Sequence, residues 1–273
     1  MKYIPRRPKT NVNVTPASPL RELLILTGGL AAITVGVYLL LGLVVDWVAP
    51  RLSGDLERKL GVVFTRTLDI APDSSQNRKW AQGLADRIQA RCVNLPYQFK
   101  IHINPSKKVN ALAFPGGNIV VCQGLLDQVA SENELAFVLC HEMGHYAHQD
   151  HLRGLGRTMI LMAMATLIFG QDSGVADFLI QSIGLAELNF SRQQETEADE
   201  FGLQTLHCFY GHVGGSTDFF AKISADHNPG RWGHYFSTHP ANERRIARLK
   251  SLARELGYDL APVKTLPAFL NVQ

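Results

Sequence analysis

The sequence lacks the compositional features of disordered and fibrous proteins. Its 273 residues include 27 lysines and arginines against 24 aspartates and glutamates, and 46% of them are hydrophobic. This excludes the low hydrophobicity and high net charge that keep chains unfolded, and the glycine period of collagen is missing too. We find no internal repeat and no low-complexity tract. Once a non-globular segment is set aside, the rest fits one folded domain.

A basic surface for nucleic acid is also missing. The net charge is +3, but five lysines and arginines against Glu22 give residues 1–22 a charge of +4, so the rest of the chain is close to neutral. No stripe of basic residues with interleaved aromatic residues follows residue 46. Binding to a phosphate backbone depends on such a stripe. The sequence therefore predicts no nucleic-acid partner.

Charge is absent altogether from residues 23–45, which read LLILTGGLAAITVGVYLLLGLVV. A helix of this length crosses the hydrocarbon core of a bilayer, roughly 30 Å thick. We expect a transmembrane anchor that contacts membrane lipid. The competing interpretation is a cleaved signal peptide, whose apolar stretch is usually about 7–15 residues long and ends at an A-x-A-like site. Neither feature is present. No cysteine lies at the end of the segment to accept a lipid, because the first cysteine of the chain is Cys92.

The flanks of this segment differ in basic residues. Five lysines and arginines precede it, and three follow within fifteen residues, namely Arg51, Arg58 and Lys59. Basic residues favour the cytoplasmic side. We therefore expect a cytoplasmic N-terminus and a main domain outside the cytoplasm, in the periplasm if the cell has two membranes.

Cysteine is sparse and shows no C-x-x-C spacing. The four cysteines are Cys92, Cys122, Cys140 and Cys208. If all are oxidised, three pairings are possible. We expect them to be small buried hydrophobic residues instead.

The pattern after the anchor predicts a juxtamembrane connector at 46–74 and one domain at 75–273. Apolar residues recur at helical spacing in 77–90 and alternate in 97–103. Short extended runs at 111–114 and 118–122 flank a Pro-Gly-Gly turn and predict a small antiparallel sheet. The second run is either an interior strand or an edge that pairs with an extended substrate. The fold class is α+β, mainly α, with one transmembrane helix ahead of the domain.

Two helices of the domain have clear signals at one end or along one face. Ser131 and Glu134 have the spacing of a capping box, which predicts a helix starting near residue 132. A second helix near the C-terminus is indicated by apolar residues on one face and by Pro240 in its first turn. The apolar residues of that face are Ile246, Leu249, Leu252 and Leu256.

An apolar run at 159–169, followed by a second at 178–188, is too short to cross a bilayer. The leading interpretation is a buried helical pair that roofs the core. A hairpin that dips into the membrane surface is the alternative. Three methionines in the first run leave a pliable substrate-facing surface as a third possibility.

The strongest chemical signal is His141-Glu142-Met143-Gly144-His145 on a predicted helix. Histidines at i and i+4 lie one turn apart on the same face, so both can bind one zinc ion. Glu142 is rotated about 100° from His141 and lies beside the metal, where it can accept a proton from water. The H-E-x-x-H-x-x-G-x-x-H pattern is absent, so the third ligand must come from elsewhere in the chain.

The segment Glu195-Thr196-Glu197-Ala198-Asp199 offers that ligand. Glu195 and Asp199 share a helix face, and the small Ala198 and Gly202 let another helix approach closely. We expect Glu195 on the zinc and Asp199 behind it, where it accepts a hydrogen bond from the other nitrogen of a zinc-bound histidine.

These motifs resemble those of metallopeptidase family forty-eight, the HtpX-like and BepA-like zinc peptidases, which are related to the CaaX prenyl proteases. The resemblance covers roughly residues 75–250. It is carried by NALAFPGGNIVVCQGLL, HEMGH, SRQQETEAD and STHPANERRIARL. It implies a gluzincin-type domain with one zinc ion per chain held by His141, His145 and Glu195, and Glu142 as general base. The substrate is not implied, because the chain has neither the several spans of the HtpX-like branch nor the helical repeats of the BepA-like branch.

His239 is the further histidine that we place near the metal. It could donate to the developing oxyanion, swing onto the zinc in a resting state, or cap a helix. We expect hydrolysis of peptide bonds in extended or misfolded polypeptides, in protein quality control. The alternatives are a zinc-stabilised chaperone or scaffold and a hydrolase of other amides. The sequence carries no signal for an oligomeric state.

Overall fold

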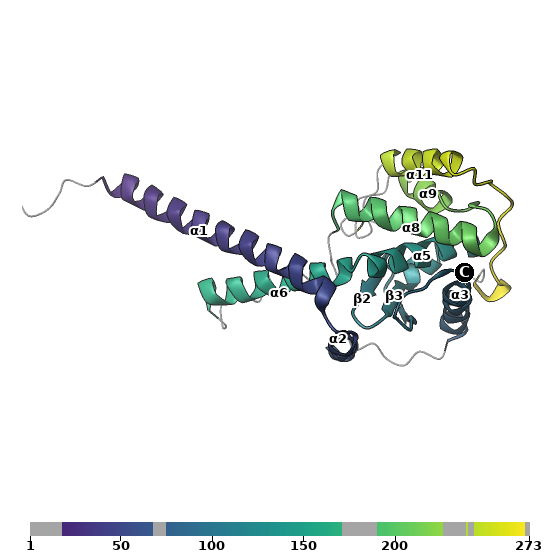
Figure 1. The fold of residues 1–273 in the computed structure, drawn as a ribbon, viewed down its shortest axis with the longest axis horizontal. Coiled ribbons are helices and arrows are strands. Elements are labelled where there is room, and N and C mark those ends of the chain that lie inside the picture. Colours follow the sequence, from purple (N-terminus) through teal and green to yellow (C-terminus); the bar gives the residue numbers. More distant parts are fainter. Residues whose placement is uncertain (1–17, 68–74, 171–189, 226–238, 240–242, 271–273) are drawn as a thin grey trace, which may run out of the picture.

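The structure is a computed structural model that describes residues 18–67, 75–170, 190–225, 239 and 243–270. Figure 1 shows a rounded body from which α1 and part of α6 project on the same side. The helices are α1 (Pro19–Val48), η1 (Ala49–Arg51), α2 (Gly54–Thr67), α3 (Gln76–Cys92), α4 (Gln123–Leu126), α5 (Glu132–Ala147), α6 (Asp150–Phe169), α8 (Arg192–Tyr210), α9 (Asp218–Ala225), α11 (Glu243–Glu255) and η2 (Ala268–Leu270). The strands are β1 (Lys100–Asn104), β2 (Ala111–Phe114) and β3 (Asn118–Cys122). The expected fold class, mainly α with a small sheet, is confirmed.

The sheet is mixed. Its order is β1-β3-β2, with β2 antiparallel to β3 and β1 parallel to β3. The antiparallel pair follows from the Pro-Gly-Gly turn, where Gly116 and Gly117 have φ of 79° and 82°. The parallel pairing of β1 with β3 departs from the expected antiparallel sheet. Strand β3 lies between β2, its partner in the hairpin, and β1, which comes from outside the hairpin. Because β3 is the central strand, it is not a sheet edge that could pair with an extended substrate. Among the described strands, β2 is an edge strand that flanks the same turn.

Helix α3 forms where the periodicity predicted it and covers the sheet. Leu84 and Ile88 are fully buried in the core. The side-chain amide of Gln82 donates to the carbonyl of Phe99 at 2.9 Å and accepts from the N–H of Ile101 at 2.8 Å. These two bonds satisfy one backbone group of β1 and one of the residue before it, at the edge of the sheet.

The pair α5 and α8 forms the centre of the body and carries the zinc motif. The hydroxyl of Ser131 accepts from the N–H of Glu134 at 3.1 Å, so α5 begins where the capping pattern predicted. A Cβ on Gly144 would lie 2.8 Å from Cα of Ala198, and one on Gly202 would lie 3.3 Å from the backbone N of His141. The helices therefore meet backbone to backbone through small residues, as the sequence predicted.

The C-terminal helix α11 packs its Leu249 into the core, as its apolar spacing predicted. Leu256 lies just beyond the end of α11 and is 42% exposed. Pro240, which we expected in the first turn of α11, lies outside the described residues.

One pair of cysteines departs from the expectation of buried thiols. Cys92, at the end of α3, and Cys208, near the end of α8, form a disulfide with their Cα atoms 5.9 Å apart. Cys122 and Cys140 are free and buried, as expected. The pairing depends on two helix ends that lie 116 residues apart in sequence, and local spacing carries no signal for such a contact.

Helix α6 does not roof the core as the leading interpretation had it. Leu152 and Leu155 near its start are buried, but Leu167 and Ile168 near its end are 85% and 50% exposed. Its second half leaves the body beside α1 (Figure 1). The roof interpretation is therefore wrong for most of 159–169, in which Ala165 is buried but the large side chains at both ends are exposed. The second apolar run at 178–188 lies outside the described residues.

Candidate metal centre

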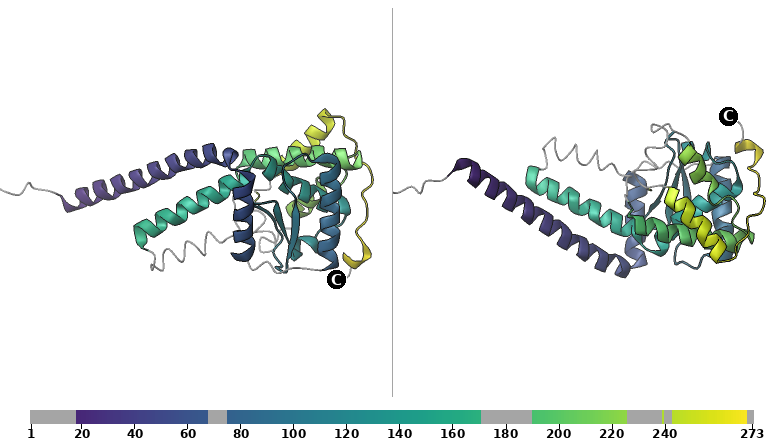
Figure 2. Two further views of the ribbon diagram at one scale, coloured as in Figure 1. Left: turned by 60° about the horizontal axis from the view of Figure 1, so that its bottom comes forward. Right: turned by 90° about the horizontal axis from the view of Figure 1, so that it is seen from above.

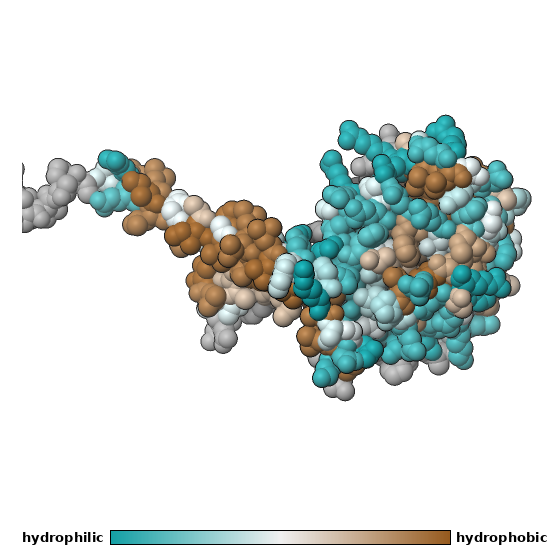
Figure 3. Space-filling model, viewed as in Figure 1, coloured by the Kyte–Doolittle hydropathy of each residue, from teal (hydrophilic) through white to brown (hydrophobic). Residues whose placement is uncertain are grey.

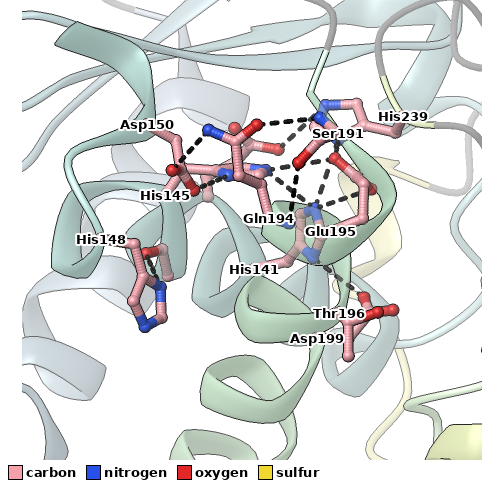
Figure 4. Close-up of polar contacts among 12 residues, drawn as sticks. His141, His145, His148, Asp150, Ser191, Gln194, Glu195, Thr196, Asp199 and His239 are labelled. Carbon is pink, nitrogen blue, oxygen red and sulfur yellow. Dashed lines mark hydrogen bonds and ion pairs between the residues drawn. The ribbon is translucent and has the colours of Figure 1, made fainter. Parts of the chain in front are cut away.

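Four buried side chains converge where α5 meets α8. His141 and His145 come from α5, Glu195 from the first turn of α8, and His239 from an isolated described residue (Figure 4). One ligand atom from each can be chosen so that all four lie within 4.8 Å of one another. The structure thus brings together the three residues predicted as ligands, and it places His239 beside them.

Most of the distances between these atoms are close to those between ligands that share one tetrahedral metal ion. Nε2 of His141 and Nε2 of His145 lie 3.2 Å apart, and both lie 3.5–3.7 Å from carboxylate oxygens of Glu195. Nδ1 of His239 lies 2.9 Å from Oε1 of Glu195 and 3.3 Å from Nε2 of His141. Ligands at about 2.0–2.1 Å from a tetrahedral ion are separated by about 3.3 Å.

Each histidine on α5 is oriented by a carboxylate behind it. Nδ1 of His141 lies 3.0 Å from Oδ1 of Asp199, and Nδ1 of His145 lies 3.1 Å from Oδ2 of Asp150. These contacts leave both Nε2 atoms directed at the shared centre, the arrangement in which a carboxylate fixes the tautomer of a metal-binding histidine. Asp199 lies where we expected it, but Asp150 was missed.

The position of Asp150 results from a tight turn and a helix cap. Gln149 adopts a left-handed conformation with φ of 58°, which ends α5 and brings Asp150, the first residue of α6, back toward His145. Gln194 completes a capping box with Ser191 at the start of α8 and also donates to Oδ1 of Asp150 at 2.7 Å. The cap that starts α8 therefore also holds this carboxylate in place.

Arg245 on α11 binds two carboxylates of the site at once. Its guanidinium donates to both oxygens of Asp199 at 2.7 and 2.8 Å, and Nη1 lies 2.5 Å from Oε2 of Glu195. In the sequence, Arg245 is only part of a motif near the C-terminus, and its spacing does not indicate a contact with the residues of α5 or α8. Its role depends on how α11 packs, which local pattern does not report.

Burial and charge shift the ionisation of the two histidines on α5 in opposite directions. Burial lowers the pKa of His141, and its neighbouring carboxylates only partly offset this. Burial also acts to lower the pKa of His145, but the hydrogen bond to Asp150 and the charge of Glu195 outweigh it and raise the pKa to about 9. A positive charge is thus favoured at the centre when no other cation is present.

Glu195 and Asp199 have lowered pKa values although both are buried. Burial opposes ionisation of Glu195, yet the charges of His239 and Arg245 hold its pKa well below its usual range. The pKa of Asp199 is lowered against the same burial by Arg245 and His141. Glu142 and Asp150 add two more buried carboxyl groups, against two guanidiniums, that of Arg245 and that of Arg153, whose Nη1 lies 3.4 Å from Oδ1 of Asp150. This surplus of buried acid fits a divalent cation.

Glu142 lies next to the four converging side chains but outside them. It is 1% exposed, and its Oε1 lies 3.6 Å from Nε2 of His239. Its other oxygen, Oε2, has no hydrogen-bond partner among the described residues. A buried carboxylate oxygen with an open lone pair is suited to accept a proton from a group that enters the site.

Comparisons with known proteins identify the family. The family model described as Peptidase family M48 matches residues 75–253. The chain is 30% identical to metalloprotease LoiP of Escherichia coli over 66% of this chain and 72% of LoiP.

More distant relatives are longer than this chain. The putative beta-barrel assembly-enhancing protease of Vibrio cholerae is 26% identical over 71% of this chain and 44% of its own length. Mitochondrial metalloendopeptidase OMA1 of Schizosaccharomyces pombe is 29% identical over 56% of this chain and 46% of its own length. The chain thus matches less than half of the length of these two relatives. The family match nevertheless covers most of the chain and includes α5 and α8: the chain belongs to peptidase family M48 and is a hydrolase of the metalloendopeptidase class.

Proposed function

We propose that this protein is a membrane-anchored zinc endopeptidase. One zinc ion is held by His141, His145 and Glu195, with Glu142 as the general base. The observation that carries the proposal is the set of distances of 3.2–3.7 Å between the ligand atoms of these three residues. The match to a family of metallopeptidases and the excess of buried carboxyl groups over basic side chains support the same ion.

Zinc, when bound, supplies a Lewis acid that makes water nucleophilic near neutral pH and polarises a carbonyl oxygen. The side chains then divide the proton transfers between them. Glu142 accepts the proton that the attacking water loses, because it lies beside the centre and its Oε2 has no hydrogen-bond partner among the described residues. It returns that proton to the amine that leaves the cleaved bond. Asp199 and Asp150 hold the two imidazoles still meanwhile.

The substrate is proposed to be an extended segment of polypeptide that pairs with β2. The backbone N–H of Cys122 donates to the carbonyl of Asn110, so the next carbonyl along, that of Ala111, faces away from β3. It lies 3.4 Å from Nε2 of His239, which places this edge against the centre. Edge pairing selects unfolded or flexible segments. This supports a role in protein quality control.

The anchor is proposed to be α1, with the body outside the cytoplasm. Residues Pro19–Arg51 form a helix that is long and apolar enough to cross a membrane. The disulfide between Cys92 and Cys208 suits an oxidising compartment. Val45 and Asp46 at the end of α1 contact α6, which supports an uncleaved anchor. A reporter fused after Gln273 tests this orientation, and a cytoplasmic signal contradicts it.

The Glu142→Gln variant tests the enzyme proposal. We expect the variant to keep one zinc per chain, because Glu142 is not a ligand, and to lose about 10²–10⁴-fold in casein cleavage. Glu197→Gln makes the same change at a half-buried residue of α8 that bonds Gln193, and it should leave cleavage unchanged. Equal cleavage by Glu142→Gln and the wild type excludes Glu142 as the base. A zinc-loaded wild type that cleaves nothing favours the scaffold alternative.

A further inference from the structure

The second half of α6 forms an exposed apolar surface outside the body. From Thr158 to Phe169 the helix has no charged residue, whereas its first eight residues include Asp150, Arg153 and Arg157. The large side chains exposed along this half are Met159 (57%), Leu161 (38%), Leu167 (85%) and Ile168 (50%). Isolated leucines on a surface are common, but a whole charge-free half-helix is not.

This surface continues that of α1. The two helices leave the body on the same side and lie next to each other where α1 ends (Figure 2). A Cβ on Gly156 would lie 2.7 Å from a methyl carbon of Val45, so the glycine lets the helices approach closely. Figure 3 shows the two helices as one apolar projection from a largely polar body. No residue of α1 is buried in the described structure.

A band of charged and aromatic side chains separates this projection from the body. Asp46 accepts from Arg157 at 2.9 and 3.0 Å, and Arg153 lies 3.9 Å from it. Trp47 is 63% exposed and lies under the guanidinium of Arg51, 4.5 Å from the ring centroid. Tryptophan and arginine at one level along two adjacent helices mark the headgroup region of a bilayer.

We propose that residues 158–169 of α6 insert into membrane hydrocarbon beside α1, in the leaflet that faces the body. This rests on the proposed membrane anchor. The twelve residues span about 18 Å, so the half-helix enters a core of roughly 30 Å without crossing it. Lipid is favoured over a protein partner because the surface is continuous with a helix that has the length and hydropathy of a membrane span.

The insertion fixes the distance between the catalytic centre and the membrane surface. Asp150 at the start of α6 contacts His145, and Arg157 in the charged band follows seven residues later. Seven residues of helix correspond to about 10 Å. The centre is therefore held close to the headgroups, and the polypeptides within reach are segments that lie at the membrane surface.

The test places a fluorescent NBD label on single cysteines of the full-length protein in liposomes. Leu167→Cys reports the tip of α6, Met159→Cys a site near the charged band, and Leu30→Cys the anchor. Leu260→Cys, a leucine of the body that is 75% exposed, is the matched control. The unsubstituted chain gives the background, since its free cysteines are buried. Emission is measured with iodide in the water and with doxyl-labelled lipid in the bilayer.

We expect doxyl lipid to quench the label at residue 167 and iodide to leave it bright, with the reverse at residue 260. The label at residue 159 should respond most to a doxyl group near the headgroup. Quenching of residue 167 by iodide, or by neither reagent as under a protein partner, overturns the inference. If residue 30 is quenched by lipid in that case, the anchor stands and only the insertion of α6 fails. If residue 30 is quenched by iodide, the anchor fails as well.

Discussion

Arg245 shows how strongly the centre depends on a residue that is not a ligand. Its three contacts tie Glu195, a proposed ligand, to Asp199, which orients His141. Arg245 is 6% exposed, so its removal takes a buried partner away from both carboxylates. Groups that orient ligands in this way typically change metal affinity when they are lost.

We predict that Arg245→Leu lowers zinc affinity about 10–100-fold, as measured by competition with a chelator. Arg245→Lys should fall between this variant and the wild type, because lysine keeps the charge but cannot bind Asp199 with two parallel hydrogen bonds. Arg248→Leu is the control on the same helix, since Arg248 is exposed and pairs with Glu200 at the surface. Wild-type affinity in Arg245→Leu would contradict this role.

His239 lies where a fourth ligand of a tetrahedral ion would lie. An imidazole there leaves no corner for water, so we expect this arrangement to be a resting state. His239→Ala should therefore raise casein cleavage several-fold at unchanged zinc content. A fall in cleavage at unchanged zinc content instead assigns His239 to the oxyanion.

At the scale of elements, a buried carboxylate of α2 bonds several groups of the body. Glu57 is 3% exposed and accepts from the hydroxyl of Tyr97 at 3.0 Å and the N–H of Gly116 at 3.1 Å. Nε2 of His151 on α6 lies 2.9 Å from Oε1 of Glu57. Nδ1 of His151 is in turn 3.4 Å from the carbonyl of His145. A chain of contacts therefore links α2 to α5, the helix that carries His141 and His145.

Glu57→Gln should lower the unfolding midpoint by about 5 °C at pH 7, from a loss of about 2 kcal/mol in charged hydrogen bonding. Burial opposes ionisation of Glu57, but His151 and the N–H of Gly116 outweigh it and hold the pKa below its ordinary 4.5. A lowered pKa stabilises the fold above pH 4.5, and this contribution is lost as the pH falls through the folded-state value.

The difference between wild type and Glu57→Gln should therefore shrink below pH 4.5. Asp55→Asn is the control, because Asp55 on the same helix is exposed and pairs with Arg58 at the surface. Equal midpoints for the two variants across the pH range would show that Glu57 does not hold α2.

The disulfide joins the ends of α3 and α8. It closes a loop of 116 residues, for which the loss of chain entropy in the unfolded state stabilises the fold by about 2–5 kcal/mol. Dithiothreitol should lower the unfolding midpoint of the wild type, since Cys208 is exposed. The double variant Cys92→Ser, Cys208→Ser should begin at the lower midpoint and not respond. A wild type insensitive to the reductant contradicts the bond.

At the scale of the whole molecule, the features that could be predicted from the sequence are those that depend on local geometry. The spacing of His141 and His145, and of Glu195 and Asp199, places each pair on one helix face whatever the rest of the chain does. Apolar periodicity likewise predicted α3 and α5.

The remainder depends on contacts between distant elements. Arg245 reaches the site only because α11 packs over α8, and Cys92 meets Cys208 only because two helix ends coincide. The parallel pairing of β1 and the exposure of the second half of α6 also follow from packing rather than from pattern. The composition of 159–169 suited a core helix as well as a membrane-inserted one, and its position beside α1 favours the second.

Anomalous X-ray scattering at the zinc edge, from crystals of the zinc-loaded full chain, tests the central claim most directly. The account predicts one zinc per chain, about 2.0–2.2 Å from Nε2 of His141, Nε2 of His145 and a carboxylate oxygen of Glu195. A zinc ion bound elsewhere, or in contact with only one of these three side chains, would contradict it.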